Sequence, residues 1–169
     1  MMRIIPMPSA PEPMLDPDIA WNGAFGDLVR TRLDDAVNPG GLRAERALET
    51  AVLICLMTDA RADPTELRDG DVNRGWPGDG FDLEPGETPL GSKLWLLRRR
   101  ALTPDVEMLA ADYAREALQT LVDQHAFVRF DVRATADRAG NRLELDVAGY
   151  GRDGARTYDR KFAVLWDQL

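Results

Sequence analysis

The sequence is poor in the side chains that most enzymes use as nucleophiles, bases and metal ligands. It has one cysteine and one histidine, and its only serines are Ser9 and Ser92. A Ser-His-Asp site needs a serine beside a base, and Ser92 in LGSKL lacks the strand-turn-helix elbow of a hydrolase. No set of cysteines and histidines exists for zinc. The sequence therefore predicts a protein that is not an enzyme and that holds no metal and no cofactor.

The single cysteine and the single histidine have structural explanations. Cys55 lies in AVLICLM, where a small buried thiol is expected. A lone cysteine excludes an internal disulfide, which suits a reducing compartment. His125 falls between a predicted helix and a predicted strand, so we expect a capping or surface residue there.

Negative charge exceeds positive charge, and long apolar runs are scarce. The formal net charge is -8 and the pI is about 4.7, which argues against binding to a phosphate backbone, because that affinity comes from clustered lysines and arginines. The one basic cluster, Arg98 to Arg100, is suited to an acidic protein surface. No apolar run approaches the ~20 residues that span a bilayer. We expect a soluble protein without a nucleic-acid or membrane partner.

The chain divides into an arm and one domain. Residues 1–17 are rich in proline and lack the apolar segment of a secretory signal, so they predict an extended arm. Residues 18–169 fit a single domain, which at this size buries roughly two-thirds of its unfolded surface. Within it, residues 18–33 predict short strands or a hairpin.

Two further segments carry apolar patterns. Residues 47–63 are apolar at both alternating sets of positions, which favours a strand buried on both faces and leaves a buried helix starting near Leu42 as the alternative. Residues 103–124 predict an amphipathic helix, with Thr103 as its cap and Pro104 in its first position. The face expected to be buried consists of Val106, Leu109, Ala110, Tyr113, Ala117 and Leu121.

The residues after His125 predict an antiparallel meander of three strands. Apolar residues alternate with polar ones in each strand, and ADRAGN and GRDGAR have the composition of hairpin loops. The apolar faces consist of Val128, Phe130, Val132 and Ala134, then Leu143, Leu145 and Val147, then Phe162, Val164 and Trp166. The charged opposite face is expected to meet solvent. A helix packed on a small, mostly antiparallel sheet predicts an α+β fold.

A long loop rich in glycine and proline occupies residues 59–92. It far exceeds the usual connection of about 4 to 6 residues, and loops of that size are functional or disordered. Trp76, Phe81 and Trp95 lie in or near it and offer apolar area for docking, which argues against disorder.

The acidic part of this loop permits an alternative function. Asp69, Asp71 and Asn73 alternate as in a calcium loop, but Arg74 replaces the expected glycine and Gly80 replaces the closing glutamate. The carboxylates that are near enough in sequence to form a glycosidase pair are Asp79, Asp82, Glu84 and Glu87. The glycines form no phosphate-binding motif. A cell-wall hydrolase or a calcium-dependent binding module that uses residues 69–87 is the alternative reading.

Several segments together resemble a known family. Four segments are similar to segments of the gene-46-type baseplate proteins of Mu-like contractile-tailed phages. They are TDARAD after the apolar segment, RGWPGD in the loop, LGSKLWLLRR before the helix and FAVLW at the end of the meander. The resemblance covers residues 47–166. That family looks like the small baseplate wedge proteins, sometimes named lysozyme-like, that initiate the contractile sheath. Their Glu-Pro-Arg motif is absent here, where the sequence reads VDQHAFVRF, so none of its residues is carried over.

The resemblance implies an α+β structural subunit of a tail baseplate in the virion, assembled in the host cytoplasm. It implies about six copies around the tail axis, with other wedge subunits, tube or hub proteins and the first sheath ring as neighbours. Independently, the edge of a small sheet can accept an added strand, and a proline-rich arm can lie across a neighbour. The residues expected to bind partners are Trp76, Trp95, Arg98, Arg99, Arg100, Phe162, Val164 and Trp166.

Overall fold

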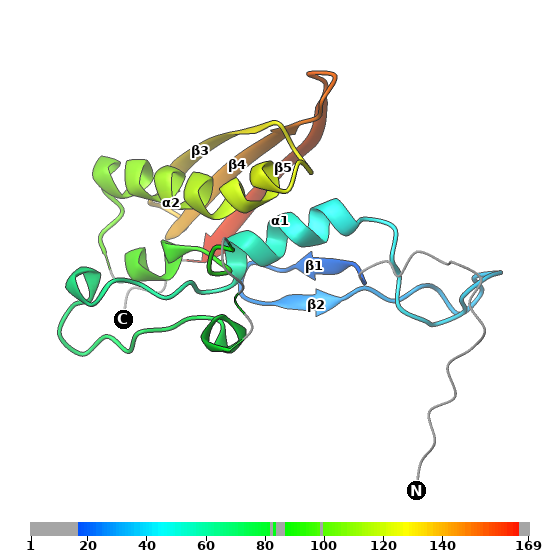
Figure 1. Ribbon diagram of the computed structural model, residues 1–169, viewed down its shortest axis with the longest axis horizontal. Helices are drawn as coiled ribbons and strands as arrows, with labels where there is room; N and C mark the ends of the chain where they lie inside the picture. Colours follow the sequence, from blue (N-terminus) through cyan, green and yellow to red (C-terminus); the bar gives the residue numbers. More distant parts are fainter. Residues whose placement is uncertain (1–16, 82, 84–86, 99, 166–169) are drawn as a thin grey trace, which may run out of the picture.

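The computed structural model describes residues 17–81, 83, 87–98 and 100–165. These residues form two α-helices and two antiparallel sheets, which is the predicted α+β class (Figure 1). Of the predicted arm, only Pro17 lies within the described residues. In this part of the chain, no helix is both long enough and apolar enough to cross a membrane.

The domain begins with the predicted hairpin. Strand β1 (Ile19–Trp21) pairs in antiparallel fashion with β2 (Gly26–Leu28). Asn22 builds the turn, because its side-chain oxygen accepts hydrogen bonds from the backbone N–H groups of Ala24 and Phe25 at 2.9 and 3.0 Å.

Helix α1 spans Ala47–Met57, so the favoured prediction of a strand was wrong. The alternative of a buried helix is correct, but the helix begins at Ala47 and not near Leu42. The helix lies between the hairpin and the rest of the core, in contact with β1 and with helix α2 (Figure 1). Its buried residues are Thr50, Val52, Leu53, Cys55 and Leu56. Because neighbours cover several of its sides, apolar residues occur all around it and erase the helical period.

Helix α2 spans Pro104–Asp123, within one residue of the prediction at each end. Pro104 occupies the first turn, and Asp105 and Glu107 lie at the positive end of the helix dipole. Thr103 stands at the N-cap position, but its side chain makes no capping hydrogen bond, so that predicted role was wrong. The fully buried face consists of Val106, Ala110, Ala111, Ala114, Ala117, Leu118 and Leu121.

The predicted meander is formed by β3 (Arg129–Asp137), β4 (Arg142–Tyr150) and β5 (Arg156–Leu165), in the order β3-β4-β5. The buried residues of its apolar face include Val132, Leu143, Leu145, Val147 and Phe162. Val128 precedes β3 and is 52% exposed, so its assignment to the buried face was wrong. The strands present a charged face on the other side, as expected from their alternation.

The segment between the helices is irregular, as predicted, with short 3₁₀ turns at Pro64–Glu66, Pro77–Gly80 and Lys93–Leu97. Buried hydrogen bonds fix its two ends together. Ser92 Oγ donates to Leu56 O at 2.6 Å, and Trp95 Nε1 donates to Ala60 O at 2.8 Å. The Ser92 hydroxyl is therefore structural, as a buried donor to a helix carbonyl.

Candidate functional site

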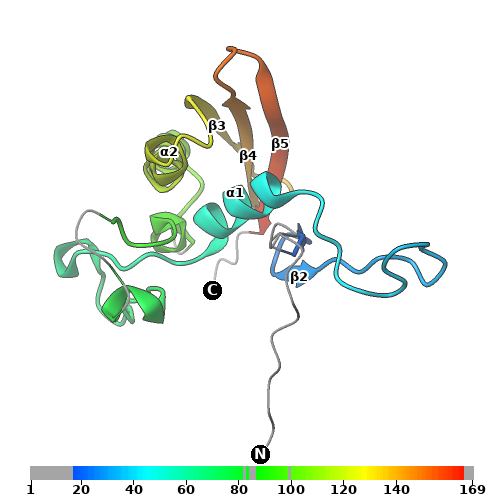
Figure 2. The ribbon, with the colours of Figure 1, turned by 45° about the vertical axis from the view of Figure 1, so that its right-hand side comes forward.

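The edge of the sheet at β5 is more open than the edge at β3. Within the described residues, β5 pairs with β4 on one side and with no strand on the other. Helix α2 packs along β3, where the Ala136 N–H donates to Glu107 Oε1 at 3.2 Å. Figure 2 shows α2 beside β3, with β5 at the far side of the sheet. An additional strand would therefore meet less obstruction at β5.

Hydrogen bonds along β4 show which neighbour each of its residues faces. Val128 N donates to Tyr150 O at 2.8 Å, so the Tyr150 carbonyl points toward β3. Gly151 N donates to Ala155 O at 2.9 Å, so the backbone N–H of Gly151 points toward the chain that leads into β5. Successive residues of an antiparallel strand alternate in this way.

The same alternation identifies the outward groups of β5. The Ala136 N–H points away from β4, so the backbone of its partner Leu143 faces β5. Val147 is four residues further along β4, has the same orientation and lies opposite Arg160 in the strand register. The backbone of Arg160 therefore faces β4. It follows that the N–H and C=O groups of Asp159 and Lys161 point away from the sheet.

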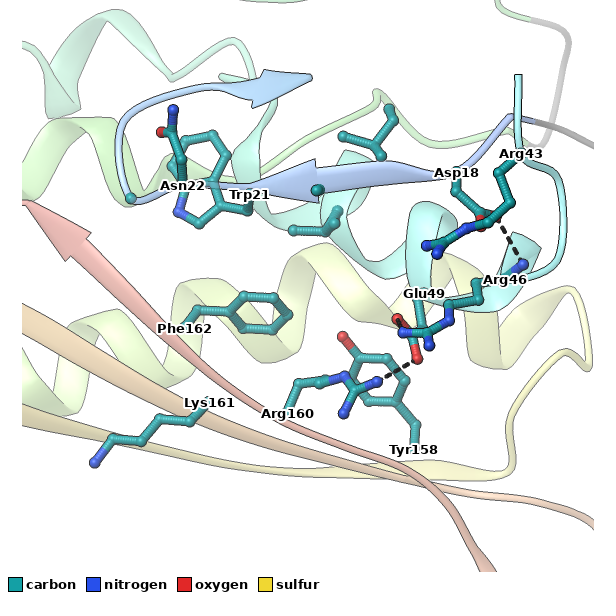
Figure 3. Close-up of a pocket in the computed structure, with 14 residues that line it drawn as sticks. Asp18, Trp21, Asn22, Arg43, Arg46, Glu49, Tyr158, Arg160, Lys161 and Phe162 are labelled. Atoms are coloured by element: carbon teal, nitrogen blue, oxygen red, sulfur yellow. Dashed lines mark hydrogen bonds and ion pairs between the residues drawn. The ribbon is translucent and has the colours of Figure 1, made fainter. Parts of the chain in front are cut away.

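Two hollows border β5, and together we name them the β5 groove. The hairpin hollow, of about 400 Å³, lies between β1 and β5 and has Ile19, Trp21, Leu53 and Phe162 among its lining residues (Figure 3). The helix hollow, of about 440 Å³, lies between the first turn of α1 and β5 and is lined in part by Ala47, Leu48 and Tyr158. Arg46, Glu49, Tyr158 and Arg160 line both.

A buried carboxylate fixes the wall of the hairpin hollow. Asp18 is 1% exposed and accepts hydrogen bonds from Arg43 Nε at 2.6 Å, Arg46 N at 2.7 Å and Glu45 N at 3.0 Å. Burial alone would raise the pKa of Asp18, but these bonds and the Arg43 charge outweigh it and lower that pKa. The ionised side chain thereby joins the start of β1 to the segment that leads into α1.

An ion triad separates the two hollows. Arg160 donates to Glu49 Oε1 at 2.7 Å and Arg46 lies 3.3 Å from Glu49 Oε2, so two guanidinium groups share one carboxylate (Figure 3). The arginine side chains are about half exposed, at 47% for Arg46 and 49% for Arg160. Burial and the nearby Glu49 raise the pKa of Tyr158, so its phenol stays protonated.

The other cation of the groove is engaged on the opposite face. Lys161 lies 2.5 Å from Glu144 of β4, and this hydrogen bond raises the pKa of Lys161. Exposed pairs of this kind contribute little to stability. Because the Lys161 side chain is directed toward Glu144 of β4, it does not cover its own backbone N–H at the edge of the sheet.

The predicted partner-binding residues are spread over the molecule. Phe162 is buried in the wall of the hairpin hollow, whereas Trp95 is buried in a separate cluster with Ala62 and Leu96. Trp76 is 52% exposed. Arg98 and Arg100 are partly buried after the 3₁₀ turn Lys93–Leu97. Arg99, Trp166 and the Val164 side chain lie outside what the structure describes.

Sequence reasoning missed Asp18, Glu49 and Arg160 as residues of one site. The contact between Glu49 and Arg160 joins residues that are 111 positions apart. One signal was available, because Arg160 is a basic residue on the face of β5 that also carries Tyr158 and Phe162. A charge on an otherwise apolar strand face indicates a specific partner.

The acidic loop is organised by backbone contacts. The Asn73 side chain accepts from Ala62 N at 3.0 Å and donates to Ala62 O at 2.8 Å. Asp71 accepts from Arg68 N at 2.9 Å, and Asp79 accepts from Leu90 N at 3.2 Å. Over the described residues, no group of three or more potential ligands could hold a metal ion. His125, expected as a capping or surface residue, is exposed just after α2.

Comparison with known proteins identifies the family. A family described as phage protein GP46 matches residues 48–156. Baseplate protein gp46 of Escherichia phage Mu is 38% identical over 123 residues, which cover 72% of this chain and 77% of that protein. Mu-like prophage FluMu protein gp46 of Haemophilus influenzae is 31% identical over 153 residues, which cover 90% of this chain and 98% of that protein. The chain belongs to the phage protein GP46 family, as the sequence resemblance indicated.

Proposed function

We propose that this protein is a structural subunit of a phage tail baseplate that binds its neighbours through the β5 groove. Membership of the GP46 family and the name of the phage Mu relative support the baseplate role. The observation that carries the binding mode is the outward backbone of Asp159 and Lys161 beside two open hollows. Such an edge binds an extended segment by main-chain hydrogen bonds, while adjoining pockets select side chains.

The subunit acts as a wedge protein and initiates the contractile sheath in this proposal. Its neighbours are other wedge subunits, tube or hub proteins and the first ring of sheath protein, with six copies around the tail axis. An incoming strand at β5 extends an already folded sheet, so it needs no rearrangement of the core. The protein works without catalysis and resides in the tail of the virion after assembly in the host cytoplasm.

Proline at position 161 tests the binding mode. Lys161→Pro removes an outward N–H and should leave the β4-β5 ladder intact, because proline is tolerated on edge strands. We expect the variant to fold, but tails assembled in its presence should lack sheath in electron micrographs. Lys161→Ala is the matched control, since it also loses the ion pair with Glu144 but keeps the N–H. Normal sheathed tails from Lys161→Pro would contradict strand addition at this edge.

A further inference from the structure

The face of β5 that borders the groove has an apolar-basic-apolar pattern. Tyr158 and Phe162 are buried, and Arg160 lies between them on the same face because strand residues alternate. A strand added at this edge places its own alternate side chains next to these three, with the closest pairs about 4.5 to 5.5 Å apart at Cβ. The chemistry of β5 therefore constrains the residues of its partner.

The centre of this pattern has an excess of positive charge. Arg46 and Arg160 share a single carboxylate, Glu49, so the triad itself carries a net charge of plus one. Two further acids line the helix hollow, Glu45 and Asp159, and Asp159 pairs with Arg156. Helix α1 begins at the same place, and its N-cap residue Arg46 makes no side-chain capping bond. The positive end of the helix dipole adds to the local potential. A second carboxylate would balance the charge of the triad.

Open space for apolar side chains lies on each side of this centre. The hairpin hollow presents Ile19, Leu53 and Phe162, and the helix hollow presents Ala47 and Leu48. Leu48 is 48% exposed, so part of its apolar surface lacks cover. Covering such surface favours association by roughly 25 cal/mol per Å².

We infer that the strand bound at β5 has the pattern apolar-x-acidic-x-apolar, with the carboxylate seated between Arg46 and Arg160 and one apolar side chain in each hollow. The pattern reads the same in both directions, so it holds for a parallel or an antiparallel partner. This inference rests on the proposed strand addition, because it specifies the side chains of the strand that the edge accepts.

Short peptides test the inference directly. The probes are acetyl-Thr-Val-Thr-Glu-Thr-Val-Thr-amide and its versions with glutamine or lysine at the centre, titrated into the ¹⁵N-labelled full chain at low salt. Binding is measured by NMR shifts of the Asp159 and Lys161 amides. We expect the glutamate peptide to bind about two- to fivefold more tightly than the glutamine peptide, and the lysine peptide to bind most weakly.

Variants of the chain separate the role of Arg160 from general charge. Arg160→Gln should bring the ratio between the glutamate and glutamine peptides close to one, whereas Arg133→Gln, the same change on β3, should leave it unchanged. Equal affinities of all three peptides for the wild-type edge would overturn the acidic pattern and leave strand addition standing. If no peptide shifts the Asp159 and Lys161 amides, strand addition at this edge fails and the inference fails with it.

Discussion

Replacing Asp18 by alanine should destabilise the protein by about 3 kcal/mol. The carboxylate accepts three hydrogen bonds from Arg43, Glu45 and Arg46 while almost fully buried. Removing one partner of a buried charged pair costs about 3–5 kcal/mol. The Arg43 side chain is 29% exposed, so water can solvate part of it after the change, and we expect the lower end of that range.

Urea unfolding followed by circular dichroism measures this change, with amide exchange at Val29 as a second readout. Val29 N donates to Asp18 O across the hairpin, so its protection reports on a hairpin that unfolds by itself. Asp27→Ala is the matched control, because Asp27 is exposed in the same hairpin and its side chain accepts the N–H of the adjacent Leu28. A loss below about 1 kcal/mol together with unchanged Val29 protection would refute the role of Asp18.

Three further predictions concern pH, a glycine and the cysteine. The folded state lowers the pKa of Asp18 below 3.8, so the ionised Asp18 stabilises the fold fully above that pH and loses this effect as the pH falls through the folded-state pKa. The urea midpoint should therefore fall on acidification below about pH 4. The fall should be less steep in Asp18→Asn. Gly91→Ala should lower the free energy of unfolding by about 2 kcal/mol or more, since φ is +109° and a Cβ would lie 2.5 Å from Thr58 O. Gly154→Ala is the control and should lower it less, because φ is +75° but no atom lies within 4 Å of the added Cβ. Equal losses of stability in the two variants would contradict the clash at Gly91. Burial raises the pKa of Cys55 to about 11, so a thiol reagent at neutral pH should modify it only after unfolding, and rapid labelling of the native chain would show that the thiol is accessible.

Local sequence patterns predicted much of the fold. Pro104 and the acids after it marked the start of α2, and strict alternation in the last strands marked the meander. Helix α1 was only the second choice, because packing on several sides leaves residues such as Val52 and Cys55 without a distinguishable period. The sequence alone could not decide between a strand and a helix here, because the decision depends on the neighbours that cover the helix.

The candidate site was harder to predict than the fold. The hypothesis of strand addition at the last strand came from the topology, and it named Phe162. The triad of Arg46, Glu49 and Arg160 depends on a contact between distant segments. Asp18 was predicted only as the first residue of the hairpin segment, yet it is among the most buried residues. Long-range pairing of charges has no local signature, so only the folded arrangement brings these residues together.

A density map of the assembled tail particle at near-atomic resolution tests the central claim most directly. The account predicts an extended segment of another chain about 4.8 Å from β5, hydrogen-bonded to the backbone of Asp159 and Lys161. A β5 edge that faces solvent in the assembled baseplate, or that meets a neighbour through side chains alone, would contradict it.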